Sequence, residues 1–140
     1  MELSKLTPNF AVADIRETVH FYREKLGFEL VILVPESQDS VEQQFAEGKE
    51  YVYAMMKKGN VELMFQRYDS FHEDVSLADK KISGASVSFF IEGEGVEAFY
   101  DELKNRGIEM SELKLTWYNI REFYLKDNNG YILGFAEEKK

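Results

Sequence analysis

Apolar and polar positions follow the same order in the two halves of this chain. In the first half, an alternating stretch over residues 6–12 leads into a helical stripe of apolar side chains that ends at Gly27. In the second half, an alternating stretch in which Val87, Phe89 and Ile91 share a face leads into a second such stripe. Alternation predicts a half-buried strand, whereas recurrence at helical spacing predicts an amphipathic helix. The pattern therefore predicts a duplicated module.

Both predicted helices carry a Phe-Tyr pair. The apolar stripes comprise Ile15, Val19, Tyr22 and Leu26 in the first half, and Val96, Phe99, Tyr100 and Leu103 in the second. Asp14 with Glu17 is an acidic variant of the capping box, which predicts where the first helix begins. Gly27 and Gly107 suit the left-handed residue that commonly ends a helix.

Further predicted strands, of which residues 108–115 are only weakly patterned, complete each half as a βαβββ module. They cover residues 28–34, 51–56 and 61–65 in the first half, and residues 108–115, 120–126 and 131–136 in the second. Gly59-Asn60 and Asn129-Gly130 are turn signals between the last two strands of each half, because Asn and Gly tolerate a positive φ. Residues 36–50 are polar and acidic, and predict a loop or a flap.

The predicted fold class is α+β, with two tandem βαβββ modules forming a curved mixed sheet with a concave cleft. Module 1 covers about residues 1–67, a connector with a short helical turn about residues 68–83, and module 2 about residues 84–140. One sheet face carries large aliphatic side chains that pack on the helices. The other carries Thr7, Asn9, Glu62, Gln66, Ser86 and Ser88. These groups suit a solvated cleft, and equally the ordinary solvent face of a half-buried sheet.

Length and charge narrow the class of protein. At 140 residues, the chain is expected to be one domain. Its net charge of −9 disfavours nucleic acid as a partner, because phosphate binding needs a basic surface. The absence of cysteine excludes disulfides and thiolate metal sites. Since no hydrophobic signal run or membrane-length apolar stretch is present, we expect a soluble, cytoplasmic protein without a membrane partner.

Two segments carry a family resemblance. The first reads Val12-Ala13-Asp14, Thr18, Phe21-Tyr22 and Leu26-Gly27-Phe28. The second is the hairpin Arg121-Glu122-Phe123-Tyr124-Leu125-Lys126-Asp127-Asn128-Asn129-Gly130-Tyr131, preceded by Trp117. They resemble the vicinal oxygen chelate superfamily of glyoxalases, extradiol dioxygenases and bleomycin-resistance proteins, and the hairpin is most similar to the bleomycin-resistance branch. The resemblance implies the paired-module fold, a ligand-binding cleft and a homodimer, and it leaves the chemistry open.

The resemblance also implies four cleft-facing metal positions. By spacing from the motifs they fall on Thr7, Glu62, Ser86 and Gly134. Only Glu62 is a usual ligand type, whereas a tightly held catalytic ion takes three or more ligands from His, Asp, Glu or Cys. Neither His20, in the middle of a helix, nor His72, in the connector, lies on a predicted cleft strand. We therefore predict no metal and no other cofactor.

Glu62 and an aromatic pair are the first candidates for a ligand site. The Glu62 carboxylate suits a cationic or hydroxyl-bearing ligand, or a general base. The alternative is a solvated strand glutamate paired with a lysine. Trp117 and Tyr118 suit a platform for a planar ligand, and the alternative is packing in a dimer interface or in the core.

Strand parity supplies the other candidates. Glu122 and Tyr124 point to the cleft if Phe123 faces the helices, and the alternative for Arg121 with Glu122 is a cross-strand ion pair at the surface. Further ligand-binding candidates are Tyr53, Met55, Met64, Ser86, Ser88 and Asn9. Ordinary packing is the alternative for Tyr53 and Met55.

Three functions remain open at this point. The leading hypothesis is a metal-free binding protein that sequesters a cationic or aromatic drug or metabolite, as in antibiotic resistance. The second is a lyase, isomerase or dioxygenase of the same superfamily with an atypical metal site or with Glu62 as general base. The third is a non-catalytic interaction module. A homodimer is expected, because paired modules of this kind usually share strands or clefts across a twofold axis.

Overall fold

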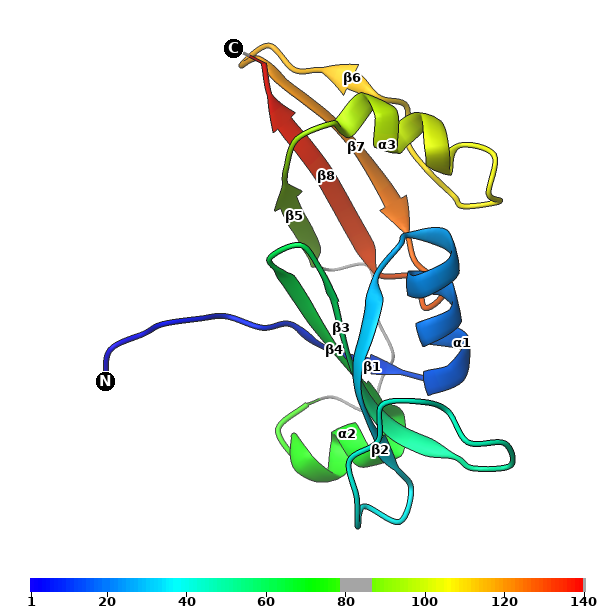
Figure 1. Cartoon of the computed structure of the whole chain (residues 1–140). Helices are drawn as coiled ribbons and strands as arrows, with labels where there is room; N and C mark the ends of the chain where they lie inside the picture. Colours follow the sequence, from blue (N-terminus) through cyan, green and yellow to red (C-terminus); the bar gives the residue numbers. More distant parts are fainter. Residues whose placement is uncertain (79–86, 140) are drawn as a thin grey trace. The chain divides into compact units, whose positions relative to one another are not determined.

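The computed structural model describes residues 1–78 and 87–139 (Figure 1). The chain divides into two compact units, Met1–Lys80 and Lys81–Lys140. Each unit holds one four-stranded mixed sheet, and the two sheets share one strand order. The predicted α+β fold of two βαβββ modules is confirmed. No helix within the described residues is long and apolar enough to span a membrane.

Unit 1 follows the predicted order of elements. They are β1 (Asn9–Val12), α1 (Ile15–His20), η1 (Phe21–Lys25), β2 (Glu29–Pro35), β3 (Tyr51–Lys58), β4 (Val61–Arg67) and α2 (Tyr68–Asp74). The sheet order is β1-β4-β3-β2, with β1 parallel to β4 and the other neighbours antiparallel. The predicted helical turn of the connector is α2, which begins directly after β4.

Unit 2 repeats this topology. Its elements are β5 (Ser88–Glu92), α3 (Val96–Leu103), β6 (Lys114–Leu115), β7 (Ile120–Lys126) and β8 (Ile132–Glu138). The sheet order is β5-β8-β7-β6, with β5 parallel to β8, and α3 lies against β7 and β8 (Figure 1).

Aromatic rings pack each helix onto its sheet. The Tyr22 ring lies 4.6 Å from the Phe65 ring, and the Tyr100 ring lies 5.2 Å from the Phe123 ring, measured between centroids. Phe123 also stacks on Phe135 at 5.6 Å. The Phe-Tyr pair of the repeat therefore places an equivalent tyrosine at the helix–sheet contact in both units.

The structure differs from the sequence prediction in three places. The first helix is capped as expected, with Asp14 accepting from the Glu17 amide at 2.9 Å, but its second half is the π turn η1. The strand predicted over residues 108–115 is reduced to β6 and one isolated bridge. Val87 precedes β5 and is exposed, so its prediction as a buried strand residue is wrong.

Residues 36–50 form a loop that is anchored to α1. The Arg16 guanidinium donates to the Lys49 carbonyl at 2.9 Å and lies 4.7 Å from the centroid of the Phe45 ring. Glu42 accepts from Lys49 at 2.6 Å and from the Tyr51 hydroxyl at 2.9 Å, and the Lys49 ammonium lowers the pKa of Glu42. Of the two expectations for this segment, the contacts favour an anchored loop over a flap.

A glutamate from β8 caps the start of α3. The residue before the helix is Gly95, which has a φ of +85° and no side chain to cap with. Glu137 supplies the missing acceptor, because its carboxylate accepts from the Gly95 and Val96 amides, both at 3.0 Å. These two hydrogen bonds lower the pKa of Glu137, with the Val96 amide contributing most. The cap therefore joins α3 to the end of the sheet.

We expect Glu137→Gln to loosen α3 at neutral pH. The lowered pKa means that the ionised carboxylate stabilises the folded state above its unfolded pKa, and that this contribution disappears as the pH falls through the folded pKa. Amide hydrogen exchange over Val96–Leu103 should therefore speed up in the variant at neutral pH, and the difference from wild type should shrink in acid. Glu138→Gln, one residue away on the other face, is the control. Equal protection in both variants would contradict this role of Glu137.

Candidate functional site

One face of each sheet lies opposite its helix, and we call it the open face. In unit 1, Phe10, Leu63 and Phe65 are buried on the α1 side. The pleat then turns the neighbouring side chains to the open face. The cross-strand register places Asn9, Met64 and Met55 in one row there, Tyr53 beside Gln66 in a second, and Glu62 beside Lys57 in a third. The predicted candidates of unit 1 therefore share one face, while their binding of a ligand stays a prediction.

Glu62 is already paired. Its carboxylate contacts the Lys5 ammonium, and Lys57 is its direct neighbour on β3. The side chain is 27% exposed. This is the arrangement of the alternative expectation, a strand glutamate paired with a lysine, and a role as general base requires the pair to open.

A hydrogen-bond network closes one end of the open face of unit 1. The buried Gln66 accepts from the Asn9 amide at 3.0 Å and donates to Ser70 at 2.9 Å and to Asp74 at 2.8 Å, both on α2. Asn9 Oδ1 is buried and has no hydrogen-bond partner within the described chain. Gln66, which lies outside the predicted ligand set, fixes the Asn9 amide. Burial also raises the pKa of Tyr53, the neighbour of Gln66 on β3.

In unit 2 the open face is organised in rows across the strands. Phe123 packs on the aromatic rings of α3, so Glu122 and Tyr124 lie on the opposite face, as parity predicts. The register of β5, β8 and β7 gives one row of Phe90, Gly134 and Tyr124. The next row consists of Glu92, Ala136 and Glu122. An aromatic row and an acidic row are therefore adjacent. Ser88 lies exposed on the same face, whereas Ser86 is outside the described residues.

The Tyr124 ring lies across Gly134. A Cβ atom at position 134 would stand 2.6 Å from Tyr124 Cε1, which is far below van der Waals contact. Only glycine leaves room for the ring at this place. On the other side of Gly134, Phe90 is 53% exposed. At position 134 the strand β8 is therefore covered by the Tyr124 ring and not by a side chain of its own.

Glu122 is a largely buried residue of this face. It is 6% exposed and makes no side-chain hydrogen bond or ion pair with any residue in the ranges 1–78 and 87–139. Arg121 points to the opposite face and contacts Glu97 of α3 at 3.3 Å, so the alternative of a surface ion pair between Arg121 and Glu122 is not formed. Burial raises the pKa of the Tyr124 phenol, and the nearby charge of Glu122 adds to that rise.

Trp117 and Tyr118 lie in the turn between β6 and β7. Trp117 is 94% exposed and Tyr118 is 52% exposed, and their rings meet edge to face at 5.0 Å. Core packing is therefore wrong for this pair. A ligand platform and a dimer contact both stay predictions.

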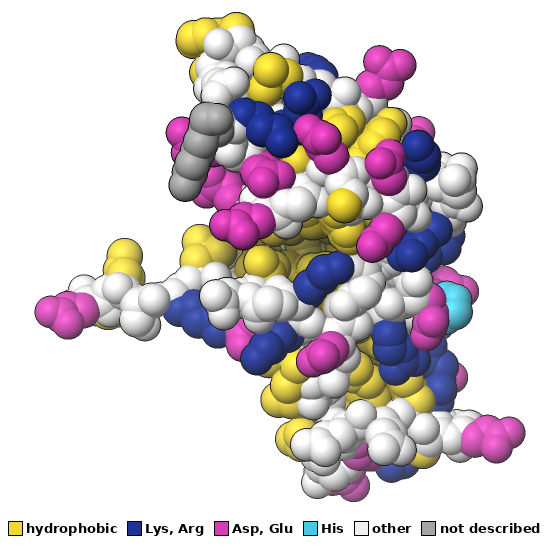
Figure 2. Space-filling view, turned by 45° about the horizontal axis from the view of Figure 1, so that its top comes forward, with side chains coloured by type: hydrophobic (Ala, Val, Ile, Leu, Met, Phe, Trp, Pro, Cys, Tyr) yellow, Lys and Arg dark blue, Asp and Glu magenta, His cyan; other side chains and the backbone are white. Residues whose placement is uncertain are grey.

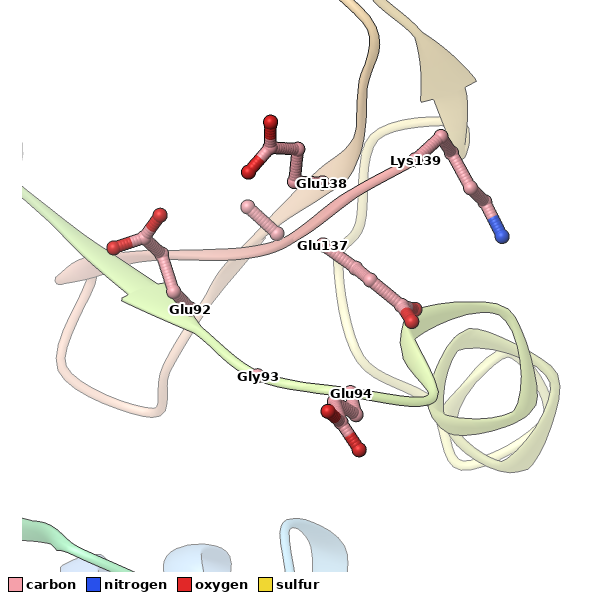
Figure 3. A pocket seen from close by; sticks show the side chains of 7 residues that line it. Glu92, Gly93, Glu94, Glu137, Glu138 and Lys139 are labelled. Carbon is pink, nitrogen blue, oxygen red and sulfur yellow. The ribbon is translucent and has the colours of Figure 1, made fainter.

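An acidic pocket of about 410 Å³ lies at the end of β5 and β8 (Figure 3). Its lining residues are Glu92, Gly93, Glu94, Ala136, Glu137, Glu138 and Lys139. Glu137 points to the start of α3, which it caps, while Glu92 and Glu138 point to the other side (Figure 3). Elsewhere, carboxylates and basic groups alternate over the surface in view rather than forming one charged patch (Figure 2).

The residues at the four family metal positions do not fit a divalent ion. Glu62 is occupied by Lys5, and Gly134 has no donor side chain and lies under the Tyr124 ring. Thr7 offers one hydroxyl, and Ser86 falls outside the described chain. Across residues 1–78 and 87–139, no three His, Cys, Asp or Glu side chains come together as a possible metal site.

We expect Tyr124 to titrate above an ordinary tyrosine. Because Glu122 disfavours the phenolate, Glu122→Gln should lower the pKa of Tyr124, while the part of the rise that burial causes should remain. A pH titration of the tyrosine Cζ carbons by NMR measures this directly. Glu102→Gln on α3 is the control and should leave Tyr124 unchanged. An unshifted Tyr124 in wild type would show that its ring is not buried in the open face.

Comparison with known proteins gives one consistent result. The profile of the Glyoxalase/Bleomycin resistance protein/Dioxygenase superfamily matches residues 6–135. Bleomycin resistance proteins of Geobacillus stearothermophilus and Staphylococcus aureus are each 26% identical over 140 residues, covering 95% of this chain and 96% of theirs.

Solved structures agree in fold. A glyoxalase/bleomycin resistance protein/dioxygenase from Nocardioides matches with a TM-score of 0.71 at 20% identity, covering 100% of this chain and 86% of its own. TnmS3, an antibiotic binding protein from Streptomyces sp. CB03234, matches with a TM-score of 0.65 at 19% identity, covering 99% of both chains. With its two βαβββ units and this match over nearly its whole length, the chain belongs to the glyoxalase/bleomycin resistance protein/dioxygenase superfamily.

Proposed function

We propose that this protein binds and sequesters a cationic or aromatic small molecule, without a metal and without changing a bond in it. The observation that carries the proposal is Glu122, a residue only 6% exposed, which lies near Tyr124 and whose carboxylate has no partner among the described side chains. A cationic group bound beside this carboxylate would gain a charge-assisted contact. The neighbouring rings add stacking and cation–π contacts for a flat ligand.

The relatives support a binding role. Bleomycin resistance proteins match over nearly the whole chain, and one structural neighbour is an antibiotic binding protein. Sequestration needs only a complementary surface and no reacting group. Bleomycin is therefore a first probe, and the natural ligand is a drug or metabolite of the same chemical class.

A metal-free site is part of the proposal. Among the described residues, the family metal positions offer one carboxylate, from Glu62, and one hydroxyl, from Thr7. These are too few ligands for a catalytic ion. The Lys5 contact also occupies the one carboxylate that the enzyme hypothesis uses as a base. No feature of the described residues favours the enzyme over the binding protein.

Calorimetric titration with bleomycin at neutral pH tests the binding role. We expect a saturable heat, recovery of chemically unchanged bleomycin, and affinity about tenfold weaker in Glu122→Gln, the effect of one charge-assisted contact. Glu102→Gln, on the opposite side of unit 2, is the matched control and should bind as wild type does. Turnover of the ligand would contradict sequestration. The absence of a binding heat with bleomycin and with every other cationic aromatic compound tested would contradict the binding role, and would favour the interaction-module hypothesis.

We also propose a cytoplasmic homodimer. Several large apolar side chains are exposed to solvent, among them Leu3 at 87% and Trp117 at 94% exposure. The first residues of the chain also extend away from the sheet of unit 1 (Figure 1). A second chain that covers these side chains would remove their apolar surface from water. The net charge of −9 disfavours nucleic acid as a partner.

Sedimentation at micromolar concentration tests the dimer. We expect a mass of about twice the 16.3 kDa of one chain, because a second copy covers the exposed apolar side chains. Trp117→Ser and Leu3→Ser each remove one of these side chains, and Val41→Ser in the anchored loop is a comparison for a general loss of surface hydrophobicity. A mass equal to one chain would overturn the dimer.

A further inference from the structure

We infer that Gly134 and Tyr124 shape a subsite in unit 2 for a planar aromatic cation, in which Glu122 is the counter-ion. The inference rests on the proposed function and deepens it, because it assigns the site to one sheet face and states how the ring and the charge of the ligand are arranged.

The glycine decides the position of the tyrosine. Position 134 lies in the central strand β8, where a side chain on the open face would normally stand. Since a Cβ there would lie 2.6 Å from Tyr124 Cε1 and 3.0 Å from Cδ1, any other residue pushes the ring away from the sheet. With glycine, the Tyr124 ring occupies the space above position 134 and, with the half-exposed Phe90 on β5, makes a floor for a planar ring.

The register fixes the distance from this floor to the charge. Glu122 is two residues from Tyr124 on β7, and Glu92 is two residues from Phe90 on β5. Two residues of a strand span about 7 Å. A ligand that stacks on the aromatic row therefore meets the acidic row when its cationic group stands about that far from the centre of its ring.

Within the acidic row, Glu122 is the largely buried member that has no partner among the described residues. Outside this row, Glu137 caps α3 and Glu62 is paired with Lys5 in unit 1. Glu122 has 6% exposure and no hydrogen bond or ion pair within the described chain, and Lys114, its register neighbour on β6, makes no salt bridge to it. The small Ala136 lies between Glu122 and the exposed Glu92, and leaves space above β8 for a cationic group.

Two small probes distinguish the contribution of the ligand's aromatic ring to binding from that of its positive charge. Tryptamine carries an indole ring with an ammonium group on a two-carbon tether, and 3-ethylindole is its neutral counterpart. Followed by amide NMR shifts of the full chain, tryptamine should perturb Phe90, Gly134 and Tyr124, and should bind about tenfold more tightly than 3-ethylindole. In Glu122→Gln this preference should fall to near unity, and in Glu102→Gln it should be unchanged.

Two variants of the aromatic floor test whether Gly134 sets the position of the Tyr124 ring. Gly134→Ala should weaken both probes, because the displaced Tyr124 ring no longer offers its face. Tyr124→Leu leaves Gly134 untouched and should weaken both probes equally, which keeps the test valid if the alanine variant does not fold. Loss of the ring-current shift at the Gly134 amide reports the displaced ring without any ligand.

The outcomes separate this inference from the proposed function. Equal affinity for the two probes, or shifts confined to residues away from β5, β7 and β8, would overturn the subsite even if bleomycin binds. Tryptamine binding at the predicted residues without bleomycin binding would support the subsite and leave bleomycin excluded as a ligand. No binding of either compound would overturn both proposals.

Discussion

The contact between one helix tyrosine and the sheet beneath it governs the rest of each unit. Tyr22 packs on Phe65 in unit 1, and Tyr100 packs on Phe123 in unit 2. Side chains of a strand alternate between faces, so burial of one phenylalanine under a helix fixes the direction of every neighbour. A slip by one residue would move Glu122 and Tyr124 under α3. The candidate site therefore depends on an aromatic contact to which it contributes no atom.

The two open faces use this common geometry differently. In unit 1 the Glu62 carboxylate contacts Lys5 and Gln66 bonds to α2, and Asn9 Oδ1 is the buried open-face atom without a partner within the described chain. In unit 2 the carboxylate of the largely buried Glu122 is left without a partner among the described residues, next to an aromatic surface. The two units share their packing, whereas the chemistry of their open faces differs. A fold that separates its core from its open face in this way can host many functions.

Most features that follow from local sequence patterns were predicted correctly, whereas contacts between distant residues were not. Most of the strands, the capping of α1 at Asp14 and the parity of β7 follow from local patterns, and the structure confirms them. The strand over residues 108–115 is mostly absent, because weak alternation does not specify pairing by itself. The pairing of Arg121 with Glu97 and the cap from Glu137 join residues far apart in the chain, and no sequence spacing predicts them.

The sequence alone determined the duplicated α+β fold, the strand faces and the shortage of metal ligands, because these depend on residue type and local period. Only the tertiary structure decided which acidic side chains are free. Glu62, the strongest candidate by sequence, is paired with a lysine from the start of the chain. Glu122 is left unpaired because its neighbour Arg121 faces the helix. The space that Gly134 leaves for Tyr124 is likewise invisible in sequence, since it depends on two strands meeting in register.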